Sequence, residues 1–170
     1  YMKDLNKQLE VAALTDSLTG IPNRLYFDQQ LETHMISSQR YGVAFSVIML
    51  DLDHFEQIND HYGHPVGDRV LREFSQIVKQ QLRLTDQFAR WGGEEFIIAA
   101  PHTLLDHALT MAERIRAAVA ECNLATIGRV TASIGVTEYR PGETAMALLE
   151  RVDDALYRAK ANGRNRVETG

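Results

Sequence analysis

The sequence has one cysteine, Cys122, among its 170 residues, which excludes an internal disulfide and fits a reducing compartment. It has no apolar run near the ~20 residues of a membrane-spanning helix, and no basic-then-apolar start like that of a signal peptide. Its 18 basic and 23 acidic residues leave a formal net charge of −5, so it has no basic footprint for nucleic acid. We therefore expect a cytoplasmic domain without nucleic-acid or membrane contact, although a longer parent protein could carry a membrane anchor.

What the chain does contain is typical of one globular domain. Hydrophobic residues make up 45% of it and charged residues 24%, and no repeat or low-complexity tract divides it. Residues 1–14 place apolar groups at a helical spacing, beginning with Met2, Leu5 and Leu9. We read this segment as the tail of an upstream linker helix, with a frayed terminal helix as the alternative, and residues 15–170 as the domain proper. The start at Tyr1 rather than Met also indicates a piece of a longer protein.

Helical and strand patterns then alternate along the chain. The run 43–50 is apolar throughout, which indicates a central strand that is buried on both faces. Periodicity and stop signals predict helices at 23–39, 66–82, 104–121 and 144–161, and strands at 86–91, 94–100, 129–138 and near 165–168. Gly92-Gly93 predicts a hairpin between two of the strands. We therefore expect an α+β fold with a central, mainly antiparallel sheet of about five strands, flanked by helices.

Carboxylates lie where the apolar strands end. Asp51 and Asp53 follow the central strand and can share a face, and Glu94 could meet Asp51 if the hairpin pairs beside that strand. Such carboxylates repel unless a positive charge lies between them, and a hard divalent cation held jointly with substrate phosphates would satisfy them. The alternative is a set of solvated carboxylates at strand ends. Adjacent Glu94 and Glu95 at a tight glycine turn weigh against an ordinary hairpin tip.

Further polar groups flank these strands. The segment 59–68 is predicted to be a polar loop that leads into a helix, and its Asn and Asp side chains suit the recognition of a base edge. Lys160 and Arg164 flank Gly163, where cations are expected from the helix dipole alone but would also clamp a triphosphate.

Six motifs follow one another in the chain: DSLTGIPNR at 16–24, DLDHF at 51–55, INDHYGHPVGD at 58–68, RWGGEEF at 90–96, TASIG at 131–135 and DALYRAKANGRN at 154–165. In this order they resemble the GGDEF-domain family of bacterial diguanylate cyclases, over about residues 14–168. The resemblance implies a palm-like fold akin to nucleotidyl cyclases. It also implies that each domain holds one GTP with Mg²⁺, or Mn²⁺ in its place, and that two domains in a homodimer join two GTP into cyclic di-GMP.

The resemblance also implies roles for individual residues. Asp51, the Leu52 carbonyl and Glu94 would bind metal, and Glu95 would be a further ligand or a proton acceptor. Recognition of the substrate would fall to the base-reading residues Asn59 and Asp68 with His64 close by, the phosphate-holding Lys160 and Arg164, the backbone near His54 and Phe55, and the Gly92-Gly93 turn. Arg83 and Asp86, with Arg114, resemble the family's inhibitory site for cyclic di-GMP, and a surface ion pair is the alternative for them.

One departure from the family pattern concerns the phosphates. Glu56 stands where the family usually has lysine, so its carboxylate either repels the triphosphate or points outward. The main hypothesis is a product-inhibited diguanylate cyclase. The alternatives are a module that binds GTP or cyclic di-GMP without turnover, and a cyclase with a mixed guanine–adenine product, against which Asp68 argues.

Overall fold

The computed structural model describes all residues, 1–170, and contains six α-helices, one 3₁₀ turn and five strands. The helices are α1 (Met2–Leu14), α2 (Arg24–Tyr41), α3 (Phe55–Tyr62), α4 (His64–Gln80), α5 (Leu105–Glu121) and α6 (Ala145–Ala161), with the 3₁₀ turn at Leu124–Thr126. The strands are β1 (Phe45–Leu52), β2 (Gln87–Arg90), β3 (Glu95–Pro101), β4 (Ala132–Glu138) and β5 (Val167–Thr169). Every helix and strand predicted from the sequence is present, with ends that shift by a few residues.

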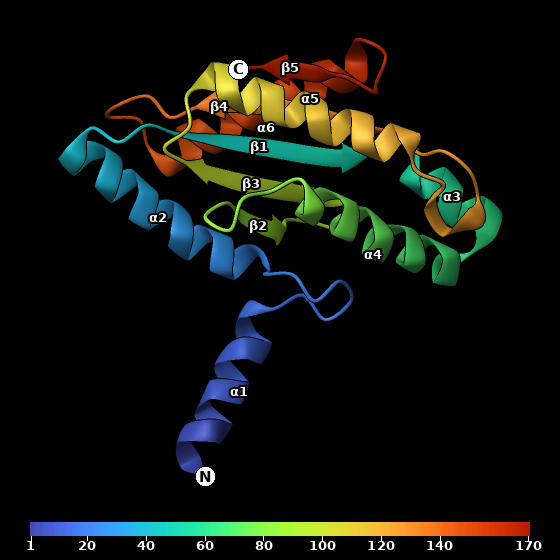
Figure 1. Ribbon diagram of the computed structural model, residues 1–170, viewed down its shortest axis with the longest axis horizontal. Helices are drawn as coiled ribbons and strands as arrows, with labels where there is room; N and C mark the ends of the chain where they lie inside the picture. The colour runs from blue at the N-terminus through green and yellow to red at the C-terminus, as the bar shows by residue number, and fades with distance from the viewer.

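The five strands form one sheet in the order β2-β3-β1-β4-β5. All neighbouring pairs are antiparallel except β4 and β5, which run parallel. The expected α+β architecture with a mainly antiparallel sheet is therefore confirmed, and Figure 1 shows the sheet with helices packed along it.

The central strand β1 is buried on both faces, as its unbroken apolar run predicts. Ile48, Leu50 and Leu52 pack into a core with residues of α3, α4 and α5. Phe45, Val47 and Met49 alternate with them and pack into a second core with residues of α2 and α6. The odd-numbered side chains of β1 thus face α6, which determines what the carboxylates at the end of β1 can reach.

The segment 59–68 is not the polar loop that the sequence indicated. α3 covers Phe55–Tyr62 and α4 begins at His64, so only Gly63 separates the two helices. Phe55 and Ile58 are buried three residues apart, and burial of this short apolar face makes the segment helical despite its polar sequence. Gly63 has a φ of 89°, which lets the chain turn sharply from one helix into the next.

The first helix, α1, contributes no buried residue to the domain. It leads away from the sheet to the N-terminus in Figure 1, and its apolar side chains are exposed, Leu5 and Leu9 among them. Among the helices of this structure, α1 included, none has the length and apolar character needed to cross a membrane.

Candidate active site at the end of the central strand

Two buried carboxylates, Asp51 and Asp53, lie at the end of β1. Asp51 is 3% exposed and Asp53 5% exposed, and both line a cavity of about 380 Å³ at this end of the sheet. Because side chains alternate between the two faces of a strand, Asp51 and Asp53 were predicted to lie on the same face, and both line this one cavity. Buried carboxylates need partners, and these two residues obtain different ones.

Asp53 is a structural anchor. Its carboxylate accepts hydrogen bonds from the Thr131 hydroxyl at 2.6 Å, the Ser133 hydroxyl at 2.6 Å and the Asn165 backbone N–H at 3.0 Å. These contacts tie the end of β1 to β4 and to the segment after α6. They use both carboxylate oxygens of Asp53, so this residue holds the site together rather than offering a free ligand.

Asp51 is paired with a cation of α6. The ammonium group of Lys160 donates to Asp51 Oδ2 at 2.5 Å. Burial raises the pKa of Asp51 to about 6; the Lys160 contact opposes this, and the charges of Glu94 and Glu95 add to it. The pKa of Lys160 is raised, because the hydrogen bond and charge of Asp51, together with the hairpin carboxylates, outweigh the effect of burial. The raised pKa of Asp51 is therefore chiefly an effect of burial, which the Lys160 contact offsets only in part.

The hairpin brings two more carboxylates to Asp51, in a register that differs from the expectation. Asp51 pairs across the sheet with Glu95, not with Glu94. Glu94 lies one residue nearer the turn, where its carbonyl accepts the Leu52 backbone N–H at 3.4 Å and its side chain lines the cavity. Burial raises the pKa of Glu94; Lys160 lowers it, and Glu95 and Glu56 raise it further.

Carboxylates outnumber cations in the cavity. Its lining contains the carboxylates of Asp51, Asp53, Glu56, Asp60 and Glu94 against the cations of Lys160 and Arg164. The chain forms no preassembled cluster of three or more acidic, His or Cys side chains around one point. Asp51 and Glu94, both with raised pKa values, nevertheless fit a Mg²⁺ ion that takes one or two carboxylates and draws its remaining oxygen ligands from substrate phosphates and water.

The predicted base-reading residues Asn59, His64 and Asp68 are not among the residues that line the cavity. Asn59 projects from α3 against Gly67 in α4, where an added Cβ would lie 1.8 Å from Asn59 Oδ1. Gly67 is therefore required for the Asn59 side chain to sit between the helices. Asp68 and His64 occupy the first turns of α4, so the short α3–α4 pair brings the three residues to one end of the domain.

The backbone at the start of α3 also borders the cavity. His54 caps α3 in the left-handed conformation, with a φ of 58°, which is uncommon for a residue with a side chain. His54, Phe55 and Glu56 all line the cavity. The first N–H groups of a helix have no partner within it, so this turn can offer donors to an anion, but it places the Glu56 carboxylate there as well.

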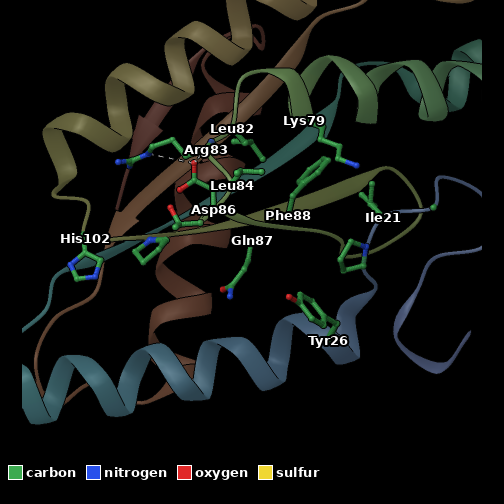
Figure 2. Close-up of a pocket in the computed structure, with 14 residues that line it drawn as sticks. Ile21, Tyr26, Lys79, Leu82, Arg83, Leu84, Asp86, Gln87, Phe88 and His102 are labelled. Carbon is green, nitrogen blue, oxygen red and sulfur yellow. Dashed lines mark hydrogen bonds and ion pairs between the residues drawn. The ribbon is translucent and has the colours of Figure 1, made fainter. Parts of the chain in front are cut away.

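A second cavity of about 660 Å³ lies beside the loop between α4 and β2. Figure 2 shows Arg83, Leu84 and Asp86 on that loop and Tyr26 on α2 across from them. Asp86 accepts the Arg83 backbone N–H at 2.8 Å, and the Arg83 side chain donates to the Thr103 hydroxyl at 2.9 Å. The Asp86 side chain is fully buried, and its Oδ1 atom has no hydrogen-bond partner.

The structure does not bring Arg114 into the lining of this cavity. Arg114 lies on α5 and donates to the Gln81 carbonyl at 2.7 Å, close to the loop that carries Arg83. The cavity has lining residues that the sequence did not single out, including Tyr26, Lys79, Gln87 and His102. No motif marks them, because they come from four separate segments.

The fold and the site together define a class of protein. A mainly antiparallel palm-like sheet carries acidic residues at the end of its central strand and at the adjacent hairpin turn, next to a lysine from the last long helix. The sequence model of the protein family described as 'Diguanylate cyclase, GGDEF domain' matches residues 13–166. This chain belongs to that family.

Individual relatives are also described as diguanylate cyclases or GGDEF domains. The chain is 44% identical over 165 residues to the diguanylate cyclase DgcM of Escherichia coli K12, which covers 97% of this chain and 40% of the relative. The chain thus spans well under half the length of that protein. The coiled-coil and GGDEF domain of DgcB from Caulobacter crescentus, in complex with c-di-GMP, superposes with a TM-score of 0.94 at 32% identity, covering 99% of this chain and 92% of that one.

A third comparison concerns the hairpin turn itself. The active GGEEF domain of a diguanylate cyclase from Vibrio cholerae superposes with a TM-score of 0.82 at 33% identity, covering 86% of this chain and 96% of that one. The turn of this chain reads Gly92-Gly93-Glu94-Glu95-Phe96. It therefore carries the same GGEEF signature by which that domain is described.

Proposed function

We propose that this domain is a diguanylate cyclase: with Mg²⁺ it condenses two GTP molecules into cyclic di-GMP and two pyrophosphates, at a site shared by two copies of the chain. The observation that carries the proposal is the arrangement of Asp51, Glu94 and Lys160 around one cavity, with the pKa values of both carboxylates raised. A GTP substrate would place this activity in the cytoplasm.

The reaction consists of two phosphoryl-transfer steps. The 3′-hydroxyl oxygen of one GTP attacks the α-phosphorus of the other, an O–P bond forms, and the bond to pyrophosphate breaks. The hydroxyl proton leaves to a base or to solvent. The same exchange in the opposite direction closes the ring and releases the second pyrophosphate.

Asp51, the Leu52 carbonyl and Glu94 would hold the divalent cation. When bound, the cation would lower the pKa of the attacking hydroxyl and neutralise charge on the leaving pyrophosphate. Glu95 faces Asp51 across the sheet, and it serves either as a further ligand or as the proton acceptor.

The remaining residues bind the nucleotide. Lys160 and Arg164 hold the terminal phosphates, together with backbone N–H groups near His54 and Phe55. Asn59 and Asp68 recognise the guanine edge with His64 beside them, since a carboxylate accepts from N1–H and N2–H₂ while a carboxamide donates to O6 or N7. Gly92 and Gly93 leave the turn open to close approach.

One such site holds one GTP, so turnover requires two copies of the domain in a homodimer. Positioning both nucleotides converts an encounter of two anions into an oriented reaction. The apolar residues of α1 are exposed. This exposure supports the proposal that α1 is a linker helix that pairs with the same helix of a second copy.

The test is incubation of the purified domain, held as a dimer by a fused zipper, with GTP and Mg²⁺, followed by chromatographic identification of products. We expect cyclic di-GMP and pyrophosphate in a 1:2 ratio, and a loss of rate of at least about 100-fold in Asp51→Asn. Glu150→Gln, an exposed carboxylate on α6, serves as the matched control. Unreacted GTP alone would leave a binding module as the function, and a product containing adenine after mixed GTP and ATP would indicate a different cyclase.

We also propose that the 660 Å³ cavity is an inhibitory site for cyclic di-GMP. Its support is the unpartnered Oδ1 of the buried Asp86, because such an acceptor is costly unless a donor reaches it and a guanine N–H edge supplies donors. Arg83 would bind phosphate or base beside it, and Arg114 would contribute from α5. Calorimetric titration of cyclic di-GMP into the domain and into Asp86→Asn tests this, with a loss of affinity of at least about tenfold expected, which is about 1.4 kcal/mol.

A further inference from the structure

The Gly92-Gly93 turn has little support within the hairpin. Both glycines are exposed, and a Cβ added at Gly93 would meet nothing within 4 Å. The hairpin closes through the Trp91 and Gly92 backbone N–H groups, which donate to the Glu95 carbonyl at 2.8 and 3.1 Å. These backbone hydrogen bonds do not involve the carbonyls of Gly92 and Gly93.

Arg90 holds those carbonyls. Its Nε donates to the Gly92 carbonyl at 3.1 Å and to the Gly93 carbonyl at 3.2 Å, and its Nη2 donates to the Gly93 carbonyl at 2.6 Å. One planar guanidinium thus bridges both glycines of the turn, a geometry that a lysine ammonium does not reproduce.

Asp16 holds the guanidinium in turn. Arg90 Nη1 lies 3.2 Å from Asp16 Oδ1 and 3.4 Å from Oδ2, and both side chains are 18% exposed. Asp16 is fixed by the Thr19 backbone N–H at 2.9 Å and the Thr19 hydroxyl at 2.6 Å. Burial opposes ionisation of Asp16, but the Thr19 hydrogen bonds and the Arg90 charge outweigh it, so its pKa lies below the ordinary value.

The same segment is tied to the end of α1. Asn23 donates from its side chain to the Ala13 carbonyl at 2.9 Å and from its backbone to the Leu14 carbonyl at 3.0 Å. The Arg90 backbone N–H donates to the Pro22 carbonyl at 2.9 Å. A continuous set of hydrogen bonds therefore runs from the last carbonyls of α1 to the turn that carries Glu94.

We propose that Asp16 and Arg90 are positioning residues for the active site: their bridge sets the Gly92-Gly93 turn and thereby holds Glu94 and Glu95 against Asp51. This inference rests on the proposed cyclase function for its kinetic consequence but not for its structural one. Neither residue belongs to the two hydrophobic cores, so loss of the bridge should loosen the turn while the fold remains.

The single tryptophan makes the turn observable. Trp91 is the only tryptophan in the chain and directly precedes Gly92. It packs edge-on against Phe27, with centroids 5.8 Å apart, and beneath the Arg24 guanidinium at 3.9 Å. Its fluorescence and its quenching by acrylamide therefore report on the start of the turn, separately from the overall helix content.

The experiment compares Asp16→Asn, Arg90→Lys and the double variant with Glu143→Gln, which removes an equally shielded arginine–carboxylate pair with side chains 18% and 12% exposed. Measurements are made where circular dichroism shows each variant folded. We expect Asp16→Asn and Arg90→Lys each to lower kcat at least about tenfold with KM for GTP within about threefold, because the turn acts on the reacting groups more than on ground-state binding. The double variant should equal the worse single one, since both residues act through one bridge.

The fluorescence measurement tests the role of the Asp16–Arg90 bridge without relying on turnover. We expect the quenching constant of Trp91 to rise at least about 1.5-fold in both bridge variants and to stay unchanged in Glu143→Gln. Unchanged quenching together with wild-type kcat in Arg90→Lys and Asp16→Asn would overturn the inference, as would equal changes in the control. If the unaltered protein makes no cyclic di-GMP, the proposed function fails, and the quenching comparison still supports or refutes the bridge.

Discussion

The ammonium group of Lys160 lies 2.5 Å from the Asp51 carboxylate. The last long helix thus delivers a cation to the carboxylate that the proposed mechanism assigns to a divalent metal. Lys160 neutralises part of the charge at the end of β1 when no other cation is there, and it competes for the same oxygen. In the proposed mechanism, metal binding and phosphate binding would therefore be coupled through one side chain.

Lys160→Gln should change the two kinds of binding in opposite directions. Without nucleotide, the variant should bind Mn²⁺ a few-fold more tightly, because the competing ammonium is gone. With a non-reactive GTP analogue and saturating Mg²⁺, it should bind nucleotide about tenfold more weakly, or about 1.4 kcal/mol, because a phosphate contact is lost. Mn²⁺ paramagnetic resonance and calorimetry measure the two quantities. A fall in both affinities would contradict the competition.

Glu56→Lys should strengthen nucleotide binding most at low Mg²⁺. Glu56 lines the active-site cavity and its charge acts on Glu94, so its carboxylate repels a triphosphate that metal has not neutralised. We expect the affinity for a GTP analogue to rise about five- to tenfold at low Mg²⁺ and less than about twofold at saturation. Glu56→Gln should give an intermediate result. An equal gain at all Mg²⁺ concentrations would mean that Glu56 acts without regard to the cation.

Arg83→Ala should relieve product inhibition. Arg83 shares the second cavity with the buried Asp86, so its loss would remove a charged donor to the product that we propose binds there. The concentration of cyclic di-GMP that halves the initial rate should rise at least about tenfold, or about 1.4 kcal/mol. Arg140→Ala, at an arginine outside this cavity, is the matched control. An unchanged inhibition curve would leave the alternative of an ordinary surface ion pair.

Gly135→Ala should destabilise the domain by displacing α6. A Cβ at Gly135 would lie 2.5 Å from the Leu156 nitrogen and 2.6 Å from the Val152 oxygen, both of them backbone atoms that cannot rotate away. We expect the free energy of unfolding in urea to fall by about 2–3 kcal/mol. Because α6 carries Lys160, nucleotide binding should weaken as well. Gly142→Ala, where no atom lies within 4 Å but φ is 85°, separates backbone strain from this close packing.

Glu143→Gln should cost stability at neutral pH but not in acid. Burial opposes ionisation of Glu143, but hydrogen bonds and charge from Arg151 and Arg140 lower its pKa below the ordinary 4.5. A lowered pKa in the folded state gives stability that is present above pH 4.5 and is lost as the pH falls through the folded value. Thermal denaturation should show that the variant loses roughly 1 kcal/mol of free energy of unfolding at pH 7. This loss should shrink toward zero as the pH falls below the pKa of Glu143 in the folded protein. A loss independent of pH would indicate packing instead.

The sequence by itself determined most of the elements and the identity of the chemical groups. The apolar run before Asp51 predicted a strand buried on both faces, and the paired glycines predicted a tight turn, because local hydrophobic pattern and backbone freedom favour such features. The order of the motifs identified the family, and the fold agrees with it. The α3 helix was missed because its polar residues obscured a buried face of only two residues, Phe55 and Ile58.

Tertiary structure alone decided which groups meet. The register that pairs Asp51 with Glu95 depends on how β3 aligns with β1, and no local signal contains that alignment. Asp53 became an anchor and Asp51 a partner of Lys160 because β4 and α6 approach the strand from different places. The bridge between Asp16 and Arg90 joins residues 74 positions apart. A single sequence states which side chains exist, whereas their distances follow from packing between segments that are remote along the chain.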